Sequence, residues 1–78
     1  MLRKLMHRPT TILSIAGSDN TSGAGIQADI KMSKLLDTYC LTAVTCVTSQ
    51  NSKNIINVFN VPSNIVESQI NVSLKEYK

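Results

Sequence analysis

Aromatic residues, histidine and long apolar runs are scarce in this chain of 78 residues. It contains no Trp, one Phe, two Tyr and a single histidine, His7. So few aromatic side chains provide no platform on which the bases of a single strand could stack. The eight basic residues also form no continuous stripe, so nucleic acid is not an expected partner. Because Cys40 and Cys46 lack metal-ligand spacing, no residue is assigned to a metal.

The sequence also has no apolar segment that approaches the length of about 20 residues needed to cross a membrane. No membrane partner is therefore expected. Residues 1–9 form a basic N-terminal extension, and the apolar segment after it is shorter than the ~7–15 residues of a signal-peptide core. Cys46 lies in an apolar stretch, which is typical of a buried thiol in a reducing compartment. We therefore expect a cytoplasmic protein.

The order of expected elements indicates an α/β fold. Residues 10–16 and 41–51 are apolar and β-branched, which predicts two strands, with a further short strand or flap over residues 55–61. A helix is expected from a cap at Thr21 or Ser22 to about Leu36, and a second helix after an N-cap at Ser63. A strand–helix–strand unit implies a parallel sheet with a right-handed crossover. Two main strands and two helices cannot complete its core, so residues 1–78 are expected to form a single partial domain of marginal stability.

All three glycines of the chain, Gly17, Gly23 and Gly25, lie in the turn between the first strand and the first helix. They favour either a tight turn or a cradle in which a ligand approaches the backbone closely. The phosphate-binding Walker pattern fails because no Lys-Ser or Lys-Thr follows a glycine. A dinucleotide site also lacks its acidic residue, because the next strand ends at Gln50.

Gln50 is the strongest candidate for a binding residue. At the carboxyl edge of a parallel sheet it would lie near Gly17, and its amide offers donors and an acceptor in one plane, which matches the edge of an aminopyrimidine. The alternative is a solvated loop glutamine. Asp19 would either face the ligand or close an Asx-turn, and Asp29 would be either a site residue or an exposed acid in the first turn of the helix.

These residues carry a resemblance to a known family. Ala16-Gly17-Ser18-Asp19, the run from Gly23 to Lys31 and Ser49-Gln50-Asn51 resemble the opening of the hydroxymethylpyrimidine/phosphomethylpyrimidine kinases of thiamine biosynthesis, members of the ribokinase-like superfamily. The segment "VPSNIVESQI" continues the likeness, which runs from about Thr11 to Val72. The resemblance implies the N-terminal part of a ribokinase-like parallel-sheet α/β fold, left incomplete.

The resemblance also implies roles for particular residues. Gln50 would hydrogen-bond the pyrimidine substrate, with Gly17, Ala24 and Asp29 nearby and Asp19 supporting the loop. In the family, ATP with Mg²⁺ phosphorylates the substrate by in-line transfer. The glycine-rich anion hole, the catalytic residue and the ATP-binding segments belong to a C-terminal half, so no catalytic residue is assigned here and neither ATP nor Mg²⁺ is expected to bind this part well.

Two departures and two alternatives accompany the resemblance. Asp37 and Cys40 stand where the family has glycines, and Asp37 is compatible with a left-handed cap. The chain could be the pyrimidine-binding half of a split kinase, whose C-terminal half is encoded separately, or a non-catalytic remnant. A pyridoxal kinase-like fragment is the other alternative, against which the Gly-Ala-Gly-Ile-Gln-Ala-Asp run argues.

Overall fold

The computed structural model describes residues 10–77 and contains a three-stranded sheet with two helices. Strand β1 (Thr11–Asp19) leads into helix α2 (Gly25–Leu35), which returns to strand β2 (Tyr39–Gln50). Strand β3 (Ile55–Asn60) and helix α3 (Ser63–Glu76) follow. These elements confirm the expected α/β class and its order. The expected N-terminal extension, residues 1–9, lies outside the described residues.

The sheet has the order β1-β2-β3, with β1 parallel to β2 and β3 antiparallel to β2. A parallel pair needs a crossover, and α2 supplies it. The two strands run in register from Thr11 opposite Tyr39 to Asp19 opposite Thr48, with one irregularity at Gly17. Gly17 of β1 lies opposite two residues of β2, because Ala16 pairs with Val44 and Ser18 pairs with Val47.

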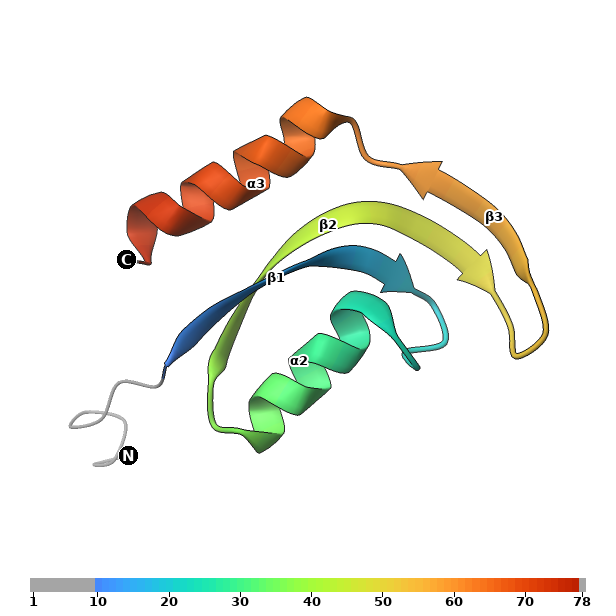
Figure 1. Cartoon of the computed structure of the whole chain (residues 1–78), viewed down its shortest axis with the longest axis horizontal. Helices are drawn as coiled ribbons and strands as arrows, with labels where there is room; N and C mark the ends of the chain where they lie inside the picture. The colour runs from blue at the N-terminus through green and yellow to red at the C-terminus, as the bar shows by residue number, and fades with distance from the viewer. Residues whose placement is uncertain (1–9, 78) are drawn as a thin grey trace.

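The two helices lie on opposite faces of the sheet. Figure 1 draws α2 below the β1–β2 pair and α3 above it. Helix α3 packs mainly against β2 and has few contacts with β1. The molecule is a slab of 46 × 29 × 13 Å, three layers deep but only a few strands wide. Neither helix is long and apolar enough to cross a membrane, as far as residues 10–77 extend.

The core is small and lies between β1, β2 and α2. Ile26 and Ala43 are its buried apolar residues, joined by the buried polar residues Ser14, Asp19 and Ser33. The first helix therefore buries the face that contains Ile26 and Ser33, whereas Met32 and Leu35, on a second apolar stripe, remain exposed. The three-stranded sheet is too narrow for neighbouring elements to cover these side chains.

The helix ends differ from the sequence-based expectation. Ala24 is the N-cap of α2 and Pro62 that of α3, and neither helix has a side-chain cap. The predicted caps at Thr21 or Ser22 and at Ser63 are therefore wrong. The end of α2 agrees with expectation: Asp37 has φ +55°, which is the left-handed conformation that an aspartate tolerates.

Candidate functional site

The candidate site lies where β1 and β2 end. From this edge β1 continues into α2 on one face of the sheet, and β2 continues through β3 into α3 on the other face (Figure 1). Neighbouring strands whose connections diverge to opposite faces leave a crevice at their carboxyl ends, and open α/β sheets bind ligands there. The structure thus places Gly17 and Gln50 at the carboxyl edge of one parallel pair, as the sequence predicted.

Asp19 closes the turn that leaves β1. Its Oδ1 accepts hydrogen bonds from the backbone N–H and the hydroxyl of Thr21, both at 2.8 Å, and its carbonyl accepts from the N–H of Ser22 at 2.9 Å. This arrangement is an Asx-turn and confirms the loop-stabilising role. These hydrogen bonds, led by that of the Thr21 backbone, stabilise the charged form and lower the pKa of Asp19 below its ordinary value of 3.8. The carboxylate is largely covered, with 5% of the residue exposed.

Two of the glycines are required by the close approach of other atoms. Gly25 has φ +63°, and a Cβ there would overlap the carbonyl oxygen of Gly17. A Cβ on Gly17 would lie 2.5 Å from the sulfur of Cys46. The tight-turn explanation is therefore correct for Gly25, whereas Gly17 lies within β1 and allows the close approach of Cys46 on β2. Gly23 differs, because a Cβ there would make only ordinary contacts, the nearest at 3.5 Å.

Gln27 joins the first turn of α2 to the end of β1. Its Oε1 accepts a hydrogen bond from the backbone N–H of Asp19 at 2.9 Å, and its Nε2 donates to the hydroxyl of Ser18 at 2.7 Å. Sequence reasoning assigned no role to this residue, although it lies inside the Gly-Ala-Gly-Ile-Gln-Ala-Asp run. Its position in that run, two residues after Gly25, was the available signal.

Asn20 holds Gln50 in place. The Oδ1 of Asn20 accepts from the backbone N–H of Gln50 at 2.7 Å, and its Nδ2 donates to the carbonyl of Gln50 at 3.1 Å. The side chain of Gln50 donates from Nε2 to the hydroxyl of Thr48 at 2.7 Å, and that hydroxyl donates to the carbonyl of Ser18 at 2.9 Å. Gln50 is half-buried at the end of a strand, so the interpretation as a freely solvated loop residue is wrong.

The five expected site residues do not all converge. Gly17, Asp19 and Gln50 lie at the end of the β1–β2 pair, and Ala24 is exposed at the start of α2. Asp29 lies in the second turn of α2, where it accepts a hydrogen bond from Ser14 in the middle of β1. The description of Asp29 as a first-turn acid is therefore wrong, because the first turn of α2 contains no acid. Asp29 connects the helix to the strand.

Side chains of the kinds that ligate metals are dispersed over the described part of the chain. Across residues 10–77 no three His, Cys, Asp or Glu side chains gather at one point, and the sequence has no glycine after Gly25. Cys46, expected to be buried, is a free and half-buried thiol against Gly17.

A hollow of about 430 Å³ lies away from this edge, between the β2–β3 pair and α3. Its walls are formed by Thr45, Asn60, Val61, Ser63, Val66, Glu67 and Ile70. None of the five expected site residues lines it.

Most of the chain is similar in sequence to known kinases. The sequence profile described as phosphomethylpyrimidine kinase matches residues 19–78. A hydroxymethylpyrimidine/phosphomethylpyrimidine kinase of Mycobacterium leprae is 48% identical over 62 residues, which are 80% of this chain and 22% of that protein. This chain therefore spans less than a quarter of that relative's length.

Solved structures show the same fold. The crystal structure of phosphomethylpyrimidine kinase from Clostridium difficile superposes with a TM-score of 0.82 at 37% identity, covering 86% of this chain and 31% of that one. The pyridoxal kinase of Staphylococcus aureus, in complex with AMP-PCP and pyridoxal, gives a TM-score of 0.78 at 34% identity and covers 88% of this chain and 26% of its own. The expected ribokinase-like kinase fold is confirmed, and this chain belongs to the phosphomethylpyrimidine kinase family.

Proposed function

We propose that this chain is the pyrimidine-binding part of a hydroxymethylpyrimidine/phosphomethylpyrimidine kinase of thiamine biosynthesis. The observation that carries the proposal is the fixed position of Gln50 at the carboxyl edge, where Asn20 binds both of its backbone groups. A preorganised amide binds a planar heterocycle without first losing the freedom of a mobile loop. Family membership supplies the class of substrate.

Gln50 recognises the pyrimidine through its planar amide. The Nε2 that donates to Thr48 has a second hydrogen, and Oε1 is an acceptor, so one donor and one acceptor can pair with an aminopyrimidine edge. Gly17 allows the ligand to approach the backbone of β1, and Ala24 lies at the start of α2 across the loop. Asp19 stabilises the loop by accepting hydrogen bonds from Thr21. Asp29 contributes by fixing α2 against β1 through Ser14.

In the complete enzyme, ATP serves as phosphoryl donor with Mg²⁺, and a pyridoxal kinase of similar fold whose structure contains AMP-PCP supports the use of this nucleotide. The groups for that chemistry lie outside residues 1–78, so the pure chain should not phosphorylate hydroxymethylpyrimidine. Formation of the phosphate by the pure chain with ATP would contradict this division of roles. A cytoplasmic location is part of the same proposal, supported by two free cysteines.

The test of the binding role is calorimetric titration of hydroxymethylpyrimidine into the 78-residue chain and its variants. Gln50→Ala leaves a polar edge of the ligand unpaired, which costs ~1–3 kcal/mol, so affinity should fall roughly ten- to a hundredfold. Gln50→Glu should be comparably harmful, because a carboxylate has no donor. Ser52→Ala, in the exposed turn after β2, is the matched control and should bind as the parent does.

Three outcomes would overturn the assignment. Equal affinity of all variants would remove Gln50 from the site. Absence of binding by the folded parent chain would favour a non-catalytic remnant. Tighter binding of pyridoxal than of hydroxymethylpyrimidine would favour the pyridoxal kinase alternative, to which the similar fold of the Staphylococcus aureus enzyme lends support.

A further inference from the structure

The side-chain amide of Gln50 has a defined orientation at the carboxyl edge. Its Nε2 donates to the hydroxyl of Thr48 at 2.7 Å, and that hydroxyl donates to the carbonyl of Ser18 at 2.9 Å. A carbonyl oxygen can only accept, so the single hydroxyl proton of Thr48 is used in the bond to Ser18. Toward Gln50 the same hydroxyl can then only accept. The amide must therefore turn its NH₂ group, and not its oxygen, toward Thr48.

The reversed amide would have fewer hydrogen bonds. If Oε1 of Gln50 faced Thr48, the hydroxyl would have to donate to Gln50 and would leave the carbonyl of Ser18. One of the two hydrogen bonds would be lost among side chains that are half-buried, and a polar group that loses its partner there destabilises the arrangement. Thr48 thus distinguishes the two ends of an amide whose oxygen and nitrogen are similar in size.

The carbonyl that receives the Thr48 proton is itself held in place. The C=O of Ser18 and the N–H of Asp19 belong to one peptide group, and this N–H donates to Oε1 of Gln27 at 2.9 Å. Gln27 also donates from Nε2 to the hydroxyl of Ser18 at 2.7 Å. Both polar groups of the peptide therefore have partners, and Ser18 is also paired with Val47 between the strands. The orientation of Gln50 is built on a fixed backbone.

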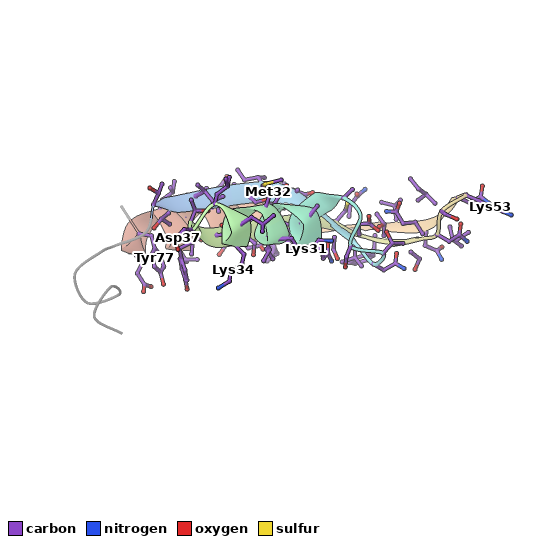
Figure 2. All side chains as sticks on the ribbon, turned by 90° about the horizontal axis from the view of Figure 1, so that it is seen from below. Lys31, Met32, Lys34, Asp37, Lys53 and Tyr77 are labelled. Carbon is purple, nitrogen blue, oxygen red and sulfur yellow. The ribbon has the colours of Figure 1, made fainter. Side chains whose placement is uncertain are left out.

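The oxygen of the Gln50 amide is left for a ligand. In the described part of the chain the side chain of Gln50 has Thr48 as its hydrogen-bond partner, and no buried side-chain oxygen or nitrogen there lacks a partner. Because Oε1 has no donor among these residues, it is not buried. Figure 2 shows Lys53, three residues after Gln50, at the tip of the molecule opposite Asp37 and Tyr77. The amide therefore lies toward that tip.

We propose that Thr48 is a positioning residue that gives the site its preference for an amino group over a ring carbonyl. With Nε2 held by Thr48, Gln50 presents Oε1 as an acceptor beside the second Nε2 hydrogen as a donor. An amino group next to a ring nitrogen matches this order, whereas a C=O next to a ring N–H places acceptor against acceptor and donor against donor. The inference rests on the proposed function, because it takes a pyrimidine as the ligand of Gln50.

The orientation is tested first without ligand, by NMR of the Gln50 side-chain amide in the 78-residue chain. Its signals are identified by their loss in Gln50→Glu. One Nε2 proton should exchange with water at least about fivefold more slowly in the parent than in Thr48→Val, which has no hydroxyl. Thr48→Ser restores the hydroxyl and should restore slow exchange. Equal exchange in the parent and Thr48→Val would overturn the role of Thr48, as would fast exchange of both protons in the parent, which needs no variant.

The preference is tested by calorimetric titration with hydroxymethylpyrimidine and with its oxo analogue, in which a C=O and a ring N–H replace the amino group and the ring nitrogen. The parent and Thr48→Ser should bind the amino compound at least about tenfold more tightly than the oxo compound. In Thr48→Val the freed amide can reverse, so this preference should shrink to within about threefold. Affinity for the amino compound should fall about two- to tenfold, because the amide loses its rotation on binding. Circular dichroism checks that both variants keep the parent's helix content.

The outcomes separate this inference from the proposed function. An unchanged preference in folded Thr48→Val would overturn the role of Thr48 even though the parent binds the pyrimidine. A parent that preferred the oxo compound would overturn the orientation itself. If the parent bound neither compound while Thr48 still slowed exchange of the Gln50 amide, the pyrimidine assignment would fail, and Thr48 would be supported as the residue that orients Gln50.

Discussion

The β1–α2–β2 unit and the β3–α3 segment differ sharply in how much of their surface they bury. Every buried residue of the described chain belongs to the first unit: Ser14, Asp19, Ile26, Ser33 and Ala43. In β3 all six residues are exposed, and α3 has no buried residue. The first unit is held by its own packing and hydrogen bonds. The second depends on the pairing of β3 with β2 and on the contacts of α3 with β2.

The hydrogen bonds show the same contrast. In the first unit, side chains of Asp19, Asn20 and Gln27 connect the loop to both strands and to the helix. The second segment is connected to the sheet by β3 pairing and by one long side chain, Gln69. Local unfolding begins where buried contacts are few. We therefore expect α3 to exchange its amide hydrogens faster than α2.

The largest effect is expected at Gly25, inside the better packed unit. Gly25→Ala places a side chain in a left-handed conformation, which costs about 1–2 kcal/mol, and against the carbonyl oxygen of Gly17, which adds overpacking of about 1–3 kcal/mol. In so small a domain this should remove most of the helical signal in far-UV circular dichroism. Gly23→Ala, whose added Cβ has ordinary contacts, is the control, and equal loss in both variants would contradict this account.

A second test concerns the contact between the two strands at Gly17. Gly17→Ala should destabilise the chain by about 1–3 kcal/mol, because its Cβ meets the sulfur of Cys46. Adding Cys46→Ala removes that sulfur, and the next contact, the carbonyl oxygen of Cys46, is at 3.6 Å. Urea unfolding of the single and double variants should therefore show recovery of most of the loss. Additive losses in the double variant would mean that backbone strain, not the thiol, is the cause.

A third test separates the two regions. Gln69→Leu should leave both backbone groups of Val44 without their side-chain partner, at a cost of about 1–3 kcal/mol. Since this amide connects α3 to β2, hydrogen exchange should accelerate across α3 and much less in α2. Ser68→Leu, at the exposed neighbouring position of α3, provides the comparison and should change neither helix to that extent. Uniform acceleration in both helices would show that the two regions unfold together.

The smallest expected effect is the acid sensitivity of the Asx-turn. The pKa of Asp19 is lowered in the folded chain, chiefly by the backbone hydrogen bond from Thr21. Its contribution to stability is therefore present above the ordinary pKa of 3.8 and is lost as the pH falls through the lower folded value. Asp19→Asn keeps an acceptor for Thr21 but does not titrate.

The urea midpoint of Asp19→Asn should accordingly fall less than that of the parent between about pH 5 and pH 2. Thr21→Val retains the backbone N–H and removes only the hydroxyl donor, so its dependence on pH should lie between the other two. If the urea midpoints of the three proteins fell equally as the pH was lowered, Asp19 would be excluded as a source of acid sensitivity.

Local pattern was sufficient to predict the elements and their order. β-Branched runs predicted β1 and β2, the amphipathic pattern predicted α2 although not its N-cap, and the alternation of strand and helix predicted a parallel pair. The strand boundaries were less accurate. β1 continues through Gly17 to Asp19, because pairing with β2 across the irregularity compensates for the weak strand propensity of glycine.

The hydrogen-bond partners could not be read from the sequence. Asn20 and Gln50 are 30 residues apart, as are Ser18 and Thr48, and Gln69 is 25 residues from Val44. Polar side chains that are equally ordinary in a turn or on a helix surface acquire partners only when distant strands are brought together.

The sequence by itself determined the α/β class, the family resemblance and Gln50 as a candidate, because these depend on residue types and spacing along the chain. Only the tertiary structure decided that α2 and α3 lie on opposite faces and that Asp29 bonds Ser14 instead of lying with Gln50. The physical reason is that side-chain periodicity specifies which face of an element is apolar. Which element covers that face is decided by backbone pairing and crossover handedness, and both act between residues far apart in the chain.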